Sequence, residues 1–253
     1  MGGITPVCLL LLLWAGVTVS SVLDLQKRIV GGQECDKTDR LYHVKLIWRN
    51  GNRRSLCGGS LISNQWILTA LHCWEDGPGW TVTAVVGVHP GPGTEEKIID
   101  YDIYHPDHDF MLLKLKNPTT TIHPVQLPDC TAPPRVPLGK EVQIAGYAAT
   151  TKAPNAVPST TLQCAKTTVA IYSTLSQMHV FYGRDITELP KVATCPGDSG
   201  GGVVYNNRIY GVIIGETIKK AVGCVRPVFV DVCEYITWIK PSINGPKRCL
   251  MCG

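Results

Sequence analysis

The segment Gly197–Gly201, which reads Gly-Asp-Ser-Gly-Gly, constrains the path of the backbone more than any other stretch of this chain. Glycine on both sides of Ser199 lets the backbone turn sharply, because no Cβ atom opposes left-handed dihedral angles. Such a turn exposes the Ser199 hydroxyl and can aim the N–H groups of Gly197 and Ser199 at one point, as a developing oxyanion requires. A serine hydroxyl is a weak nucleophile, so this use also needs a base and an orienting acid. By itself, the segment could equally be an ordinary glycine-rich turn.

Residues of both required types occur earlier in the chain. His72 follows a short apolar run, and Asp109 begins a strand-like apolar segment. Taken singly, His72 could be a packed core histidine and Asp109 a strand-end cap. The order histidine, aspartate, serine is that of the chymotrypsin-type proteases, and Arg28–Gly32 (Arg-Ile-Val-Gly-Gly) has the form of their activation site. From Arg28 to Ile239 the chain therefore resembles a trypsin/chymotrypsin-family (S1-type) serine protease zymogen of the trypsin-like branch.

This resemblance implies a role for each residue of the motifs. Ser199 would attack a peptide carbonyl, His72 would carry the proton, and Asp109 would orient the imidazole. The N–H groups of Gly197 and Ser199 would form the oxyanion hole. The expected enzyme is a serine-type endopeptidase without a cofactor. Its expected partners are protein or peptide substrates, an activating protease and protein inhibitors.

The resemblance also implies a mechanism of activation. Lys27-Arg28 suits a trypsin-like activating protease, and cleavage after Arg28 would free the amino group of Ile29. In the family this ammonium pairs with the aspartate before the nucleophile, which is Asp198 here. A buried ion pair of this kind is useful mainly because it fixes one arrangement of the chain. It would order the Gly197 N–H and the walls of the substrate pocket.

The predicted substrate pocket departs from that of trypsin. Ala193 stands where trypsins have the aspartate that binds lysine or arginine, next to Thr194, and Val228 stands where a glycine is usual. Glu216 replaces another usual glycine, and Ile214 replaces a serine that normally supports the triad aspartate. We therefore expect a shallow, apolar pocket and cleavage after small or medium apolar residues, with no strong trypsin specificity. The alternative is a catalytically weak or inactive homologue that acts as a binding or regulatory protein.

The expected fold class is all-β: two six-stranded antiparallel β-barrels of the chymotrypsin-like type with a C-terminal helix. Short alternating segments support it, since Gly202–Tyr205 and Arg208–Ile214 flank Asn206-Asn207, a predicted two-residue hairpin turn. Apolar residues at helical spacing from Val232 predict a helix that Pro241 stops or kinks. The segment 117–137, rich in proline and threonine, is expected to link the barrels.

The ends of the chain carry targeting and processing signals. Residues 1–20 are expected to be a secretory signal peptide, because their apolar run is too short to span a bilayer and small residues follow it. Residues 21–28 would be the activation propeptide, 29–241 the protease domain and 242–253 a C-terminal tail. The expected product is secreted and extracellular, without a membrane anchor. A net charge of only +4, with scattered Lys and Arg, does not indicate nucleic-acid binding.

Eleven cysteines occur, and Cys8 falls in the signal peptide. The remaining ones indicate disulfides in a secreted chain, but their number and spacing leave the pairing open. The family resemblance implies four pairs: Cys35–Cys164, Cys57–Cys73, Cys130–Cys233 and Cys195–Cys224. Cys249 and Cys252 have no family precedent, and they could form a local bridge or an intermolecular one. The protein is expected to be a monomer unless these tail cysteines cross-link it.

The segment His105–Asp109 contains two histidines and two aspartates and raises the question of a metal site. Pro106 prevents a regular ligand face, and Asp109 is already needed beside His72. We therefore predict no metal site.

Overall fold

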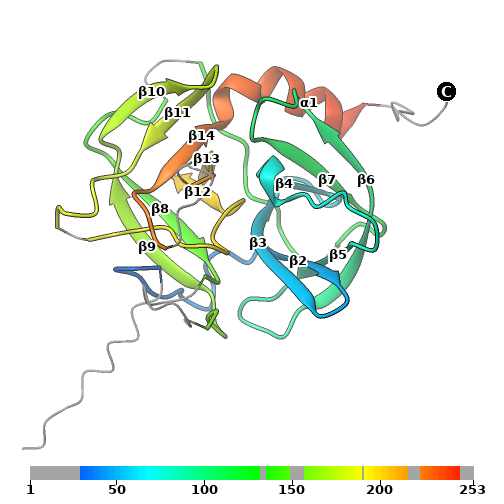
Figure 1. The fold of residues 1–253 in the computed structure, drawn as a ribbon. Coiled ribbons are helices and arrows are strands. Elements are labelled where there is room, and N and C mark those ends of the chain that lie inside the picture. The colour runs from blue at the N-terminus through cyan, green and yellow to red at the C-terminus, as the bar shows by residue number, and fades with distance from the viewer. Residues whose placement is uncertain (1–28, 132–134, 149–156, 190, 216–222, 246–253) are drawn as a thin grey trace, which may run out of the picture.

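The computed structural model describes residues 29–131, 135–148, 157–189, 191–215 and 223–245 (Figure 1). The predicted signal peptide, the propeptide with Arg28, Glu216 of the pocket, and the tail cysteines Cys249 and Cys252 lie outside these residues. No helix in the described part of the chain has the length and apolar character needed to cross a membrane.

The first half of the chain forms a closed six-stranded antiparallel barrel in the strand order β2-β3-β4-β7-β6-β5. Its strands are β2 (His43–Asn50), β3 (Arg53–Leu61), β4 (Trp66–Thr69), β5 (Thr81–Val86), β6 (Thr94–Ile103) and β7 (Met111–Leu115). Apolar side chains from these strands fill the interior; Leu46, Trp48 and Leu112 are at most 1% exposed. Closure leaves the barrel without a free edge, as the family resemblance implied for the first half.

The second half forms an eight-stranded antiparallel sheet in the order β1-β9-β8-β12-β13-β14-β11-β10. Its strands are β1 (Gln33–Glu34), β8 (Glu141–Gly146), β9 (Gln163–Thr168), β10 (Ile171–Leu175), β11 (Met178–Tyr182), β12 (Gly202–Tyr205), β13 (Arg208–Ile213) and β14 (Val228–Asp231). The all-β class is confirmed, but this sheet has eight strands rather than the expected six and ends at β1 and β10. The extra edge strand β1 forms because Gln33 pairs with Cys164, whose sulfur is bonded to Cys35.

The two sheets lie side by side in Figure 1, and the chain passes between them after β7 and before β8. This passage contains the predicted linker 117–137. All four predicted disulfide pairs are present in the structure. Cys130–Cys233 ties the passage to the 3₁₀ helix η2 (Val232–Tyr235), which follows β14. The passage is thereby fixed to the second sheet.

Helix α1 (Ile236–Asn244) returns from the second sheet to the first barrel. Its Trp238 ring lies 5.9 Å from the Phe110 ring, and the Ser242 hydroxyl donates to an Asp102 carboxylate oxygen at 2.7 Å. Of the two effects predicted for Pro241, a stop or a kink, the stop does not occur, because this residue lies inside the helix. The contacts with the first barrel hold the last turn, and the Gly245 N–H donates to the Pro241 carbonyl. The helix therefore includes residues that the sequence had assigned to the tail.

The predicted hairpin turn at Asn206-Asn207 is confirmed. Tyr205 pairs with Arg208 across β12 and β13, which leaves the two asparagines as the loop. Their φ angles are +46° and +59°. Positive φ at both central residues is typical of a type I′ turn, and asparagine tolerates it better than most residues.

This turn gives a stability prediction. Asn207→Val should lower the free energy of unfolding by about 1–2 kcal/mol, because a β-branched residue is strained at positive φ. Asn207→Gly, which is unstrained there, should change it by less than about 0.5 kcal/mol. Urea unfolding monitored by tryptophan fluorescence would measure both values. An equal loss in the two variants would contradict the turn geometry.

Candidate active site

The first barrel positions His72 through a short strand and a disulfide. His72 lies in the 3₁₀ helix η1 (Leu71–Cys73), which begins two residues after the end of β4. The Cys57–Cys73 disulfide joins η1 to β3. The imidazole remains accessible, with 41% of its side chain exposed. The disulfide therefore fixes the backbone around His72, while its imidazole ring stays accessible to solvent.

Asp109 comes beside His72 because β4 and β7 are paired. Thr69 at the end of β4 is opposite Met111 at the start of β7, so the residues that follow and precede these strands meet. One carboxylate oxygen of Asp109 accepts the His72 backbone N–H at 2.8 Å, and the other lies 2.6 Å from His72 Nδ1. The Asp109 side chain is 9% exposed. An ionised Asp109 carboxylate can only accept a hydrogen bond, so the proton of a neutral His72 ring lies on Nδ1. Nε2 of that ring is then the acceptor.

The Ser199 turn packs directly against the strands that lead to His72. The Gly58 N–H of β3 donates to the Ser199 carbonyl at 2.7 Å. Gly200 has φ of +81°, and a Cβ atom there would lie 2.2 Å from the Thr69 hydroxyl oxygen and 2.3 Å from the Gly58 carbonyl oxygen. Only glycine allows this approach. The structure therefore brings His72, Asp109 and Ser199 to one edge between the two sheets.

The same turn prepares two backbone donors. Gly197 has φ of +107°, in the region that favours glycine. Within the described ranges, neither the Gly197 N–H nor the Ser199 N–H has a hydrogen-bond acceptor. The hydroxyl of Ser199 is likewise not hydrogen-bonded to His72 among the residues described. Such bonds are often long in proteins without substrate and shorten in the complex.

Asp198 is a buried carboxyl group directly behind the turn. It is 0% exposed, and its two oxygens accept the backbone N–H groups of Ala148 at 3.1 Å and Cys195 at 3.0 Å. Burial raises the pKa of Asp198 to about 7, although these hydrogen bonds act in the opposite direction. The described residues supply no cation to this carboxyl group. A Cβ atom on Gly146 would lie 2.0 Å from its oxygen, so glycine is required there as well.

Ile29, the residue after the predicted cleavage site, is also inside the protein. Its side chain is 0% exposed and packs in the apolar core of the second sheet. The following residue, Val30, accepts the Ala193 N–H at 3.1 Å. No hydrogen bond joins the Ile29 nitrogen to Asp198 in the described part of the chain. The start of the predicted protease domain is thus connected to the residues of the predicted pocket.

Three of the four predicted pocket residues lie in the described ranges, and all three are buried. Ala193, Thr194 and Val228 are 1%, 2% and 0% exposed. The Cys195–Cys224 disulfide and the pairing of Thr194 with Val225 hold two walls together. The hydroxyl oxygen of Thr194 is buried and has no hydrogen-bond partner within the described ranges.

The backbone also fixes the register of the segment that carries Ile214. The Gly200 N–H donates to the Ile213 carbonyl at 2.7 Å, and the Ile214 N–H donates to the Val228 carbonyl at 3.1 Å. Ile214 is 3% exposed and belongs to the apolar core, together with Met178. An aliphatic side chain at this position cannot donate a hydrogen bond to a carboxylate.

Sequence reasoning missed several residues that hold the site. The Asp109 N–H donates to the Met178 sulfur of β11 at 2.9 Å, and no local sequence pattern indicates this contact. Ala148 and Gly146 around Asp198 were also missed. A signal existed for Gly146, since glycine inside a strand often marks a close approach of another part of the chain.

The histidines before Asp109 have other partners. His108 Nδ1 lies 2.9 Å from the Tyr235 hydroxyl, and His105 Nδ1 lies 3.6 Å from an Asp107 oxygen. Burial lowers the pKa of His108, and His105 adds to this effect. The described residues contain no group of three or more His, Cys, Asp or Glu side chains arranged to hold a metal ion.

Comparison with known proteins places this geometry in a family. A family model described as Trypsin matches residues 29–239. The chain is 30% identical over 261 residues to anionic trypsin of Canis lupus familiaris, covering 93% of this chain and 97% of that protein. It is 30% identical to kallikrein-8 of Rattus norvegicus, with 91% of each chain covered.

A solved structure gives the same result for the fold. Neuropsin, described as a serine protease expressed in the limbic system of mouse brain, matches with a TM-score of 0.65 and 25% identity. The match covers 84% of this chain and 99% of that one. The chain therefore belongs to the trypsin family of serine proteases.

Proposed function

We propose that this protein is a secreted serine endopeptidase, made as an inactive precursor, in which Ser199 is the nucleophile. The observation that carries the proposal is the double contact of Asp109 with His72, at 2.8 Å and 2.6 Å, beside the Ser199 turn. This contact is what a general base needs, since it sets the tautomer and the orientation of the imidazole. Membership of the trypsin family supports the same assignment.

The chemistry follows from the positions of the three side chains. His72 Nε2 takes the proton from the Ser199 hydroxyl as its oxygen attacks the peptide carbonyl carbon. The carbonyl oxygen becomes an oxyanion that the N–H groups of Gly197 and Ser199 stabilise. His72 then donates its proton to the leaving amine, and Asp109 stabilises the imidazolium in between. Water hydrolyses the acyl-enzyme by the same steps in reverse order, which regenerates Ser199.

Activation is assigned to Ile29 and Asp198. Asp198 is buried, accepts two backbone N–H groups and has a raised pKa, so a cation placed beside it would be strongly favoured. Cleavage after Arg28 by an activating protease would supply that cation as the new amino terminus of Ile29. Because Asp198 lies between Gly197 and Ser199, its ionisation state bears directly on the oxyanion donors.

The substrate class is proposed from the residue types at the predicted pocket positions. Ala193 provides no charge for a lysine or arginine side chain, and Val228 of β14 is fully buried. A small apolar side chain before the scissile bond fits this environment best. Glu216, which lies outside the described residues, is the remaining candidate for a polar contact.

One observation favours a second candidate function. The burial of Ala193, Thr194 and Val228 and the aliphatic Ile214 are also what a homologue with little activity would show. Such a protein would act as a binding or regulatory partner. Labelling of the nucleophile separates the two candidates, because it does not depend on the choice of substrate.

The first prediction concerns the nucleophile and its activation. A fluorophosphonate probe should label the purified protein at Ser199 only after cleavage following Arg28, because the oxyanion donors are ordered by that step. Mass spectrometry of the labelled peptide would identify the site. Ser199→Ala and the uncleavable Arg28→Gln are the matched controls, and both should remain unlabelled after protease treatment. Absence of labelling after verified release of Ile29 would favour the inactive homologue.

The second prediction concerns pH and follows from the raised pKa of Asp198. The unfolded carboxyl has a pKa of 3.8 and the folded one about 7, so between these values the folded precursor binds more protons. Its free energy of unfolding should therefore fall as pH rises from about 4 to 7, on the order of 4 kcal/mol relative to Asp198→Asn.

Urea unfolding at several pH values measures this slope. After cleavage, the Ile29 ammonium should lower the pKa of Asp198 and remove the slope. A precursor and an Asp198→Asn variant with parallel pH profiles would show that the carboxyl is not protonated in the folded state.

The third prediction concerns specificity. Val228→Ala should raise the ratio of kcat/KM for leucine over alanine before the scissile bond by about tenfold, because it removes two methyl groups from the pocket wall. The ratio is taken within each variant, so a loss of stability does not affect it. A peptide library provides the measurement, and a wild-type preference for arginine or phenylalanine would contradict the proposed pocket.

A further inference from the structure

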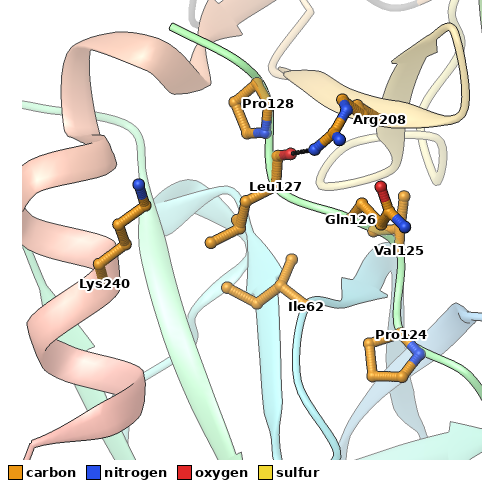
Figure 2. Close-up of a pocket in the computed structure, with 8 residues that line it drawn as sticks. All are labelled: Ile62, Pro124, Val125, Gln126, Leu127, Pro128, Arg208 and Lys240. Carbon is orange, nitrogen blue, oxygen red and sulfur yellow. Dashed lines mark hydrogen bonds between the residues drawn. The ribbon is translucent and has the colours of Figure 1, made fainter.

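A groove lies on the surface where the passage between the two sheets meets α1. It has a volume of about 430 Å³, and Figure 2 shows its lining. Lys240 projects from α1 on one side and Arg208 from the start of β13 on the other, with Ile62 and Leu127 between them. The complete lining is Ile62, Pro124, Val125, Gln126, Leu127, Pro128, Arg208 and Lys240.

The groove and the candidate active site lie at opposite ends of the same strands. Ser199 precedes β12, whereas Arg208 follows the hairpin at the other end of β12. Similarly, His72 follows β4, whereas Ile62 lies before that strand begins. A four-residue strand is about 13 Å long, so the groove and the site are separated by at least roughly that distance. A ligand in the groove would not contact the triad.

The floor of the groove is fixed by both halves of the molecule. The Val125 N–H donates to the Leu61 carbonyl of the first barrel at 2.9 Å, and the Gln126 carbonyl accepts the Ile209 N–H of the second sheet at 3.0 Å. Arg208 Nη1 donates to the Leu127 carbonyl at 2.9 Å, which holds the guanidinium at the rim. A ligand would therefore meet a surface that is already ordered, which lowers the entropic cost of binding.

The charge of the groove has one sign. Its lining holds two cations and no carboxylate, and Lys240 is exposed and forms no ion pair among the described residues. Asp129 is the acidic group near both cations. Its carboxylate already accepts the Thr131 N–H and hydroxyl, at 3.2 Å and 2.9 Å. These two hydrogen bonds lower the pKa of Asp129, and Arg208 and Lys240 add to the effect. One carboxylate at the margin leaves a net positive groove.

We propose that this groove is a docking site for an extended acidic peptide segment of a partner protein, with an aliphatic side chain next to a carboxylate. The aliphatic side chain would lie against Ile62 and Leu127, and the carboxylate would lie between Lys240 and Arg208. Contact of the aliphatic side chain with the apolar lining supplies the affinity. The two cations make the groove bind a carboxylate in preference to an uncharged amide. The volume is in the usual range for sites that hold a few side chains.

The site does not depend on the proposed catalytic activity, so its test uses full-length Ser199→Ala. The probe is a fluorescein-labelled, end-blocked peptide Gly-Leu-Asp-Leu-Gly, and binding is followed by fluorescence anisotropy. We expect saturable binding that Lys240→Glu weakens by about tenfold or more, which corresponds to about 1.4 kcal/mol. Higher salt should also weaken it, since both charges are near the surface.

Matched controls separate this site from general charge effects. Lys140→Glu changes the net charge equally at an exposed position outside the groove and should leave the dissociation constant within about twofold. A peptide with Asn in place of Asp should bind about tenfold more weakly, and so should Gly-Gly-Asp-Gly-Gly. Equal loss of binding in Lys140→Glu and Lys240→Glu would overturn the proposal.

A different occupant of the groove would give a different experimental result, and each of the following results would overturn the proposal of a partner segment. Equal binding of Gly-Gly-Asp-Gly-Gly, with displacement by a sulfated oligosaccharide, would indicate a general polyanion site. A dimer in analytical ultracentrifugation that Lys240→Glu dissociates would indicate a second copy. Binding only after cleavage at Arg28 would indicate that the chain's own segment Val22–Leu25, which reads Val-Leu-Asp-Leu, fills the groove.

Discussion

The contact between the Ser199 turn and β3 is the constraint on which the rest of the site depends. Gly58 donates to the Ser199 carbonyl, and Gly200 packs against Thr69 at a distance that a Cβ atom would not permit. These contacts join the second sheet to the two strands that carry His72. Without them, Ser199 of the second half would not be held beside the strands of the first half that lead to His72. The hydrogen bond from Gly58 and the lack of a Cβ atom at Gly200 therefore set the geometry of the proposed chemistry.

Asp198 adds an electrostatic constraint immediately behind this contact. The second sheet buries its carboxyl group against Gly146 and satisfies it with two backbone N–H groups. Burial disfavours the charged form and raises the pKa of Asp198, and the described residues place no cation beside this carboxyl group. Removal of the preceding segment is the step by which the chain could supply that charge. The activation proposal and the folding of the turn thus concern the same carboxyl group.

The strands that carry the site also connect it to the rest of the surface. One end of β12 leads from Ser199, and the hairpin at its other end presents Arg208 to the groove beside α1. The passage between the sheets lies on that side, where it is hydrogen-bonded to both. The proposed docking of a partner segment in this groove would therefore take place at a distance from Ser199.

The sequence by itself determined the residues of the proposed chemistry, the four disulfides once the family was recognised, the all-β class and the asparagine turn. The residues of the proposed chemistry and the turn are encoded locally, by a motif, a spacing or a pair of residues that tolerate positive φ, whereas the disulfide pairing followed from the family resemblance. The tertiary structure alone decided the eight-stranded open sheet, the continuation of α1 through Pro241 and the contact of Asp109 with Met178. These depend on contacts between segments far apart in the chain, such as Trp238 with Phe110. Local propensity cannot predict them, because the stabilising partner is absent from the segment that it stabilises.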